Sequence, residues 1–201
     1  RMRNHMRKTL ILASASSARR RNLEGAGAPF TQDPSSVDED QLKATLRARS
    51  APEMARALAL AKALAVSART PGALVRGADQ VLECEGRFFA KPRDKNEARA
   101  QLVRLRGRGH RLVNGLALVR DGQVLWQYDD EARLWMRDFD DAFLETYLAG
   151  TGPEVLESVG AYRLEGIGAQ LFARIEGDFF SILGLPLLPL LEVLRREGIL
   201  A

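Results

Sequence analysis

The chain has 201 residues, of which 46% are hydrophobic and 28% are charged, a balance that excludes a disordered chain. Its 17 glycines and 8 prolines follow no period, which excludes collagen-like and low-complexity sequences. The single cysteine, Cys84, excludes an internal disulfide and a zinc site built from several thiolates.

Positive charge slightly exceeds negative charge, with 30 Lys and Arg against 26 Asp and Glu and a net charge of +4. Only five of the cations are lysines, so arginine supplies the other 25. Two explanations stay open: codon usage that favours arginine, and recognition of phosphates by guanidinium groups. Composition does not separate free nucleotides from nucleic acid as the partner.

Residues 1–8 are expected to form a disordered N-terminal extension, followed by one folded domain over residues 9–201. The apolar run Thr9–Ala15 is too short for a signal peptide. No run approaches the ~18–20 apolar residues that span a bilayer. We therefore expect a cytoplasmic protein without a membrane partner.

The first half of the chain is expected to combine buried strands with two helices. Ser16 or Ser17 suits the N-cap of the first helix, and Pro52 suits the first turn of the second. In chain order we expect the strand Leu10–Ala13, the helix Ala18–Gly25, the loop Thr31–Asp40, the helix Pro52–Arg69, and the strands Ala73–Glu83 and Arg87–Ala90.

The second half is expected to add hairpins and three helices. Asp94 with Glu97 predicts a capping box, and Asp121-Gly122 predicts a hairpin turn. In chain order we expect the helix Lys95–Leu105, the strands His110–Val119, Gln123–Tyr128 and Glu131–Arg137, the helix Asp140–Ala149, the loop Thr151–Gly160, the hairpin strands Leu171–Ile175 and Phe179–Leu183, and the helix Pro186–Arg196. This irregular alternation predicts an α/β fold with a mixed twisted sheet flanked by helices.

Small hydroxyl residues and arginines stand where the first strand gives way to the first helix. Ser14, Ser16 and Arg19 or Arg20, with the free N–H groups of a helix start, are typical of an anion site. An ordinary capped helix with solvated arginines explains the same residues.

Asp79 interrupts an apolar strand, where a carboxylate is costly unless it is paired or bound to metal. It is the strongest candidate for a metal ligand or general base, and a strand-end hydrogen bond is the alternative. Lys62 either extends to solvent or points into a phosphate site. Lys91 stands before a proline in a loop, and the acidic loop around Glu39 contains a candidate magnesium ligand.

Glycines flank Glu165 and would let a ligand approach the backbone closely. A carboxylate there can accept hydrogen bonds from the two donors on the guanine edge, N1 and N2, whereas uracil and thymine offer one. A tight turn is the alternative explanation.

Taken in order, these segments resemble the Maf family over essentially Thr9 to Gly198. The matching segments are Leu12-Ala13-Ser14-x-Ser16-x-x-Arg19, Lys62-Ala63, Gly77-Ala78-Asp79, Lys91-Pro92, Gly160-Ala161-Tyr162-x-x-Glu165-Gly166-x-Gly168, Ile175-Glu176-Gly177-Asp178 and Gly184-Leu185-Pro186. The resemblance implies a nucleoside triphosphate pyrophosphatase that cuts between the α- and β-phosphates with a divalent metal, Mg²⁺ or Mn²⁺. It also implies an ITPase-like fold with a central cleft and a homodimer.

The resemblance assigns roles residue by residue. It implies that Asp79 is the catalytic acid or base and that Glu39 helps Asp79 hold metal. It also implies phosphate-binding roles for Ser14, Ser16, Arg19, Lys62 and Lys91. Arg20, from the same helix start, is a further candidate phosphate-binding residue.

Three positions bear on the choice of substrate. Family members that act on dTTP and UTP tend to have Asp-Thr and Gln-Gly where this chain has Asp79-Gln80 and Glu165-Gly166. The chain is therefore similar to the branch that prefers 7-methyl-GTP. A tryptophan at the position of Ala18 could stack on a cationic base, whereas alanine cannot.

Three alternatives are kept. The first is a dTTP or UTP pyrophosphatase of the same family, and the second is a regulator of cell division that binds nucleotides without hydrolysing them. The third is a nucleic-acid-binding module, but the interspersed acids and scarce aromatic residues argue against a nucleic-acid partner.

Overall fold

The structure is a computed structural model that describes residues 8–46 and 49–201. Most of the predicted N-terminal extension, residues 1–7, lies outside the described residues, so that expectation stays a prediction. In the described part of the chain, no helix is long and apolar enough to cross a membrane.

Within the described residues, seven strands form one mixed sheet in the hydrogen-bonded order β2-β1-β3-β5-β6-β7, with β4 paired to β3. The strands are β1 (Leu10–Leu12), β2 (Thr31–Gln32), β3 (Leu74–Cys84), β4 (Arg87–Phe89), β5 (Gly109–Arg120), β6 (Gln123–Met136) and β7 (Phe172–Glu176). β1 pairs in parallel with β2 and β3, whereas β3 with β4 and β6 with β7 are antiparallel.

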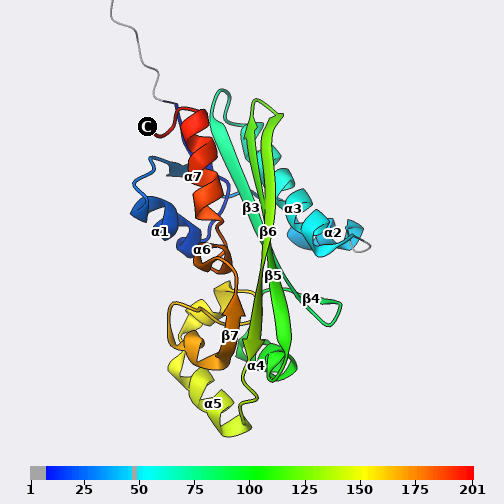
Figure 1. Ribbon diagram of the computed structural model, residues 1–201. Coiled ribbons are helices and arrows are strands. Elements are labelled where there is room, and N and C mark those ends of the chain that lie inside the picture. Colours follow the sequence, from blue (N-terminus) through cyan, green and yellow to red (C-terminus); the bar gives the residue numbers. More distant parts are fainter. Residues whose placement is uncertain (1–7, 47–48) are drawn as a thin grey trace, which may run out of the picture. The chain divides into compact units, whose positions relative to one another are not determined.

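The helices accompany these strands in irregular alternation (Figure 1). They are α1 (Ser17–Gly25), α2 (Glu39–Thr45), α3 (Ala51–Ser67), α4 (Lys95–Leu105), α5 (Asp141–Gly150), α6 (Phe179–Ile182) and α7 (Leu187–Arg196), with short 3-10 segments at Pro153–Glu157 and Ile167–Leu171. The predicted class, α/β with a mixed sheet flanked by helices, is confirmed.

The chain divides into two compact units that are described separately below. Unit 1 comprises the described residues up to Asp79, together with Gly115–Asp129 and Leu185–Ala201. Unit 2 comprises Gln80–Asn114 and Asp130–Gly184. Strands β3, β5 and β6 contribute residues to both units.

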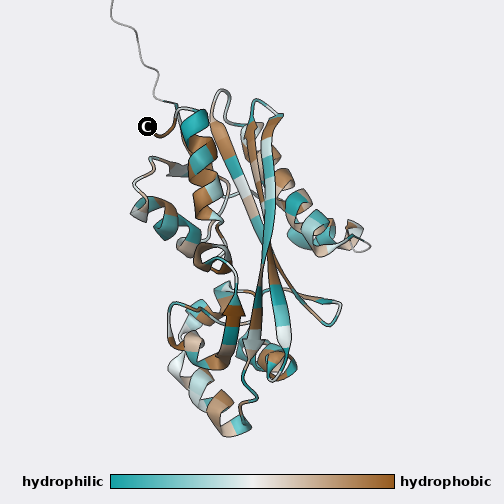
Figure 2. Ribbon diagram, in the orientation of Figure 1, coloured by the Kyte–Doolittle hydropathy of each residue, from teal (hydrophilic) through white to brown (hydrophobic). Residues whose placement is uncertain are grey.

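In unit 1, helices cover both faces of the sheet. Figure 1 shows α3 on one face and α1 and α7 on the other. Two buried alanines and one valine of α3 (Ala59, Ala63 and Val66) pack against alternate residues at β1, β3 and β5, as the period of two in a strand requires. Figure 2 shows brown and teal residues side by side along α3 and α7, as expected for helices with one buried face.

Two glycines bring α3 unusually close to the sheet. A Cβ atom added at Gly77 in β3 would lie 1.9 Å from the carbonyl oxygen of Ala59, and one at Gly115 in β5 would lie 2.3 Å from that of Ala55. The helix backbone therefore rests directly on the two strands, with no side chain between them.

The core of unit 2 contains one buried histidine. His110 is 4% exposed, and its Nε2 hydrogen-bonds the Tyr162 hydroxyl at 2.8 Å. Burial lowers the pKa of His110 to about 4, so the ring is neutral at pH 7. The buried, neutral histidine is therefore part of the core of unit 2.

Several local predictions are wrong. The predicted loop Thr31–Asp40 begins with the strand β2. The predicted capping box is only half formed, because Asp94 caps α4 while the Glu97 side chain accepts from Arg93. The predicted strand Phe179–Leu183 is the short helix α6, because the Asp178 side chain accepts from the Ser181 N–H and caps it; β7 pairs with β6 instead. The two strands predicted after Gly122 are the single strand β6. The acidic part of the predicted loop Thr31–Asp40 caps and begins α2.

Gly77→Ala is expected to lower the free energy of unfolding by about 2–3 kcal/mol, because the added methyl group would collide with the α3 backbone. Gly25→Ala is the control, since an added Cβ there meets nothing within 4 Å. Urea unfolding measures both. Equal effects of the two substitutions would contradict the close approach.

Candidate functional site

The turn between β1 and α1 brings three predicted phosphate-binding residues together. Ser16 caps α1, and its Oγ accepts from the Arg19 N–H at 3.3 Å. The Ser14 Oγ accepts from the Ser16 N–H at 3.2 Å and from Arg19 Nη1 at 3.3 Å. Because Arg19 is only 9% exposed, its charge is held inside the turn. Such a helix start with a buried guanidinium favours an anion.

Two other predicted residues of this turn lie outside these contacts. Arg20 forms a solvent-exposed ion pair with Glu24 at 3.8 Å, one helical turn away. Ala18 is half-buried and offers only a methyl group. The structure therefore separates Arg20 from the other predicted phosphate ligands of unit 1.

Lys62, Asp79 and Glu39 form a charged triad in unit 1. The Lys62 Nζ lies 2.8 Å from Asp79 Oδ1 and 2.9 Å from Glu39 Oε1. Lys62 and Asp79 are 7% and 6% exposed, so the lysine does not extend to solvent. The helix α3 and the strand β3 position this pair, and the first turn of α2 supplies Glu39.

One oxygen of Asp79 is left over. Its Oδ2 is buried and has no hydrogen-bond partner among the described residues. An unsatisfied buried carboxylate oxygen is costly, so it marks a place where a ligand is expected. Asp79 also acts on Arg19: burial lowers the pKa of Arg19, and the charges of Asp79 and Glu39 oppose that shift.

The orphan oxygen and Glu39 fit a divalent cation. Magnesium is held by one or two protein carboxylates together with waters and substrate phosphates. Across residues 8–46 and 49–201, no cluster of three or more His, Cys, Asp or Glu side chains suits a metal. A metal held by Asp79 and Glu39 would thus depend on a phosphate-bearing substrate for its other ligands.

Sequence reasoning missed a buried charge in β3. Arg76 is 0% exposed, and none of its three side-chain nitrogens has a hydrogen-bond partner within the described part of the chain. Burial and the charge of Arg19 lower the pKa of Arg76 to about 9. The signal that could have found it is an arginine in the otherwise apolar stretch Leu74–Ala78.

In unit 2, Gln80 is held by a polar network. Its Nε2 donates to the Asn114 Oδ1 at 3.2 Å and to the backbone oxygens of Ser181 and Ile182 at 3.2 and 3.1 Å. Asn114 in turn donates from Nδ2 to Asp130 Oδ1 at 3.0 Å and to the Ser181 oxygen at 2.7 Å. The acceptors around Nε2 fix the orientation of the Gln80 amide.

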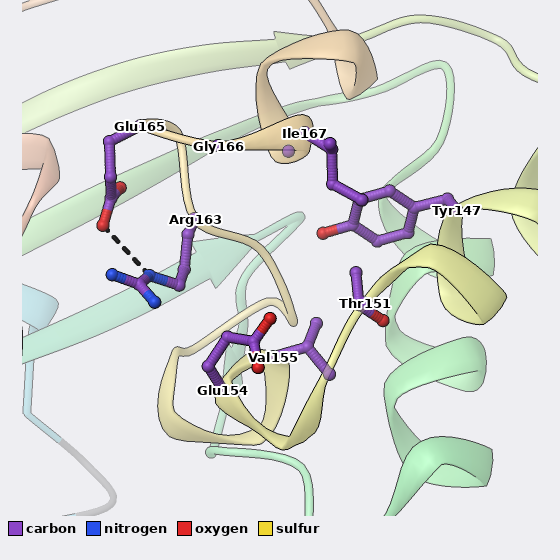
Figure 3. A pocket seen from close by; sticks show the side chains of 9 residues that line it. Tyr147, Thr151, Glu154, Val155, Arg163, Glu165, Gly166 and Ile167 are labelled. Atoms are coloured by element: carbon purple, nitrogen blue, oxygen red, sulfur yellow. Dashed lines mark hydrogen bonds and ion pairs between the residues drawn. The ribbon is translucent and has the colours of Figure 1, made fainter.

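Glu165 lines a pocket of about 210 Å³ in unit 2. Figure 3 shows it beside Arg163, whose Nε donates to Glu165 Oε1 at 3.0 Å. Tyr147 and Ile167 lie across the pocket in the same view. The Glu165 side chain is 29% exposed. A Cβ atom added at the next residue, Gly166, would have no neighbour closer than the Arg163 oxygen at 3.9 Å.

Lys91, also in unit 2, is exposed in the segment between β4 and α4. Gln101 Nε2 donates to the neighbouring Ala90 oxygen at 2.7 Å and tethers that segment to α4. The phosphate-binding role of Lys91 stays a prediction from the resemblance.

Comparison with known protein families matches most of the chain. The sequence model of the family described as "Maf-like protein" matches residues 9–197. This chain belongs to the Maf family. The resemblance seen in the sequence is therefore confirmed, and the matched region includes Ser14, Lys62 and Asp79.

Relatives of this Maf chain carry informative names. It is 53% and 52% identical over 190 residues to proteins of Granulibacter bethesdensis and Paramagnetospirillum magneticum, each named nucleoside triphosphate pyrophosphatase. These alignments cover 94% of this chain and 96% and 98% of those proteins. A Rhizobium etli protein named 7-methyl-GTP pyrophosphatase is 48% identical, with 96% of this chain and 98% of that protein covered.

Lys62→Met is expected to lower the free energy of unfolding by about 3 kcal/mol, because it leaves the buried Asp79 carboxylate without its cation. Lys43→Met is the control: the Lys43 Nζ lies 3.9 Å from Glu39 in more exposed surroundings, so a change below about 1 kcal/mol is expected. Urea unfolding at pH 7.5 compares them. A Lys62→Met protein as stable as the wild type would refute the triad as a stabilising contact.

Proposed function

We propose that this protein hydrolyses the α–β phosphoanhydride of a nucleoside triphosphate to the monophosphate and pyrophosphate, and that it prefers 7-methyl-GTP or another modified purine nucleotide. Nucleoside triphosphate pyrophosphatase activity is supported by relatives of about 50% identity over nearly the whole chain. The observation that carries the proposal is the orphan oxygen of Asp79 beside Lys62. The cytoplasmic location and the homodimer belong to this proposal as well.

Asp79 is the proposed general base. Its Oδ1 is engaged by Lys62, which fixes the carboxylate, while Oδ2 stays available to orient or deprotonate an attacking water.

The cations of unit 1 are proposed to bind the phosphate chain. The Ser14 hydroxyl accepts from Arg19 Nη1, which fixes the guanidinium group at the turn where phosphate oxygens are proposed to bind. Charge that develops on a pyrophosphate leaving group is stabilised most by donors already in place. The buried, hydrogen-bonded Arg19 fits that role better than the solvent-exposed Arg20.

A divalent metal fits the carboxylates of Asp79 and Glu39, as argued above from the orphan oxygen. When bound, such an ion neutralises charge on phosphate oxygens and lowers the pKa of a coordinated water. Glu39 sits 2.9 Å from the Lys62 Nζ, so the lysine keeps the two carboxylates together in the absence of the ion by offsetting their repulsion.

Base selectivity is assigned to Gln80 and Glu165. Three acceptors hold the Gln80 Nε2, which leaves Oε1 to accept from a donor group of the base. The Glu165 carboxylate is a second acceptor, in a pocket open enough for a ligand. Two acceptors suit the two donors of a guanine edge better than the single donor of uracil or thymine.

Asp79→Asn is expected to lower kcat by about 10²–10⁴-fold, the range that a positioned base contributes. The fold should persist, because an amide oxygen still accepts from Lys62. Asp33→Asn is the matched control, as Asp33 pairs with Arg69 at an exposed site of the same unit. Pyrophosphate release is measured with Mg²⁺, with Mn²⁺ and with EDTA. Undiminished turnover of Asp79→Asn would remove the assignment.

Substrate preference is tested with a panel of canonical, methylated and deaminated nucleoside triphosphates. The wild type is expected to favour 7-methyl-GTP, and the double substitution Gln80→Thr with Glu165→Gln is expected to reduce its kcat/KM for 7-methyl-GTP relative to UTP by about tenfold or more, the effect of roughly one hydrogen bond. Each single substitution apportions the effect. A wild-type preference for dTTP or UTP would refute the assigned roles of Gln80 and Glu165.

A further inference from the structure

Among the described residues of unit 1, only Arg76 carries a buried charge that has no role in the proposed mechanism. Its side chain is fully enclosed, and all three guanidinium nitrogens lack a hydrogen-bond partner among the described residues. A buried charge without a counterion is among the most costly arrangements in a protein. A leucine or methionine would fill the same space without that cost.

The strand register places Arg76 beside the turn that holds Ser14 and Arg19. Arg76 pairs with Leu12 across β1 and β3, and paired residues of neighbouring strands share a face. The Arg76 oxygen accepts from the Ala13 N–H at 3.0 Å, one residue before Ser14. The side chain therefore projects on the face of Leu12, opposite to the face on which Gly77 contacts α3.

Arg76 and Arg19 also repel each other. The charge of Arg19 lowers the pKa of Arg76, so the two guanidinium groups are within electrostatic range. Lys62 engages the carboxylates of Asp79 and Glu39, two acidic residues of the same unit. An anion bound at the Ser14–Arg19 turn would convert this repulsion into attraction from two sides.

We propose that Arg76 is a positioning residue for a polyphosphate: its enclosed charge acts on an anion held by the Ser14–Arg19 turn. The identity of that anion, a pyrophosphate or triphosphate group, rests on the proposed function. The buried charge lowers the stability of the free protein, and binding of the anion offsets that loss. Stability and affinity should therefore change in opposite directions when Arg76 is neutralised.

The test uses inorganic pyrophosphate as the probe, with thermal unfolding and calorimetric titration of the full chain. Arg76→Met is expected to raise the Tm of the free protein by a few degrees and to weaken pyrophosphate binding about tenfold or more. An Arg76→Met protein that unfolds at a lower temperature, or that does not fold, would show that Arg76 is structural and would overturn the proposal.

Two further variants separate charge from shape. Arg76→Lys keeps the charge and is expected to bind pyrophosphate within about threefold of the wild type. Arg120→Met removes a cation of the same unit that pairs with Glu197 at 3.3 Å, and is expected to leave pyrophosphate affinity unchanged. If Arg76→Lys binds as weakly as Arg76→Met, or if Arg120→Met weakens binding equally, the buried charge is not the cause.

The two proposals fail in different ways. If the wild type binds pyrophosphate but releases none from any nucleoside triphosphate, the proposed function fails while the role of Arg76 stands. If the wild type hydrolyses a nucleotide and Arg76→Met binds pyrophosphate as tightly as the wild type does, the role of Arg76 fails alone.

Discussion

The direct contact of the α3 backbone with β3 and β5 is the constraint on which the candidate site of unit 1 depends. Gly77 allows that contact because it has no side chain, and Asp79 is the next residue of β3 that points to the same face. Lys62 lies one helical turn after Ala59, the residue that Gly77 touches. Their 2.8 Å ion pair thus follows from where the helix rests on the strand.

Buried charges of this unit differ in how they are satisfied. Lys62 serves two carboxylates, and Arg19 is held by a serine hydroxyl, whereas Arg76 and one oxygen of Asp79 have no hydrogen-bond partner in the described part of the chain. Folding alone would disfavour burial of Arg76 and of this Asp79 oxygen, because no hydrogen bond offsets the loss of their hydration. Arg76 is positive and the Asp79 carboxylate is negative. In the proposed reaction, the arginine would act on a polyanion and the carboxylate on a cation or water.

Sequence reasoning located most elements because their end signals are local. Ser16, Asp94 and Asp140 each accept a backbone hydrogen bond at a helix start, as their types predict. It misplaced α6, where the apolar pair Phe179-Phe180 resembles a strand and only the Asp178 cap distinguishes a helix. It also divided β6 at Asp129, because charged residues in the middle of a long strand resemble a turn.

The site was predictable only as far as residue types reveal it. Asp79 stood out as a carboxylate in an apolar strand, and the family pattern pointed to Lys62, but neither showed that the two form an ion pair. The Gln80 network escaped prediction because it joins residues distant in sequence, from Asn114 to Ser181. Arg76 was hidden among 25 arginines, since burial, not residue type, makes it unusual.

The network around Gln80 also restricts which residues its position tolerates. The Nε2 group faces three oxygen acceptors, so a glutamate of the same size would place a carboxylate oxygen against two carbonyls and an amide oxygen. Glutamine and glutamate differ by one atom, yet only the former can both anchor itself and present an acceptor outward. Any drift of this position toward an acidic residue would therefore carry a folding penalty before it altered the substrate.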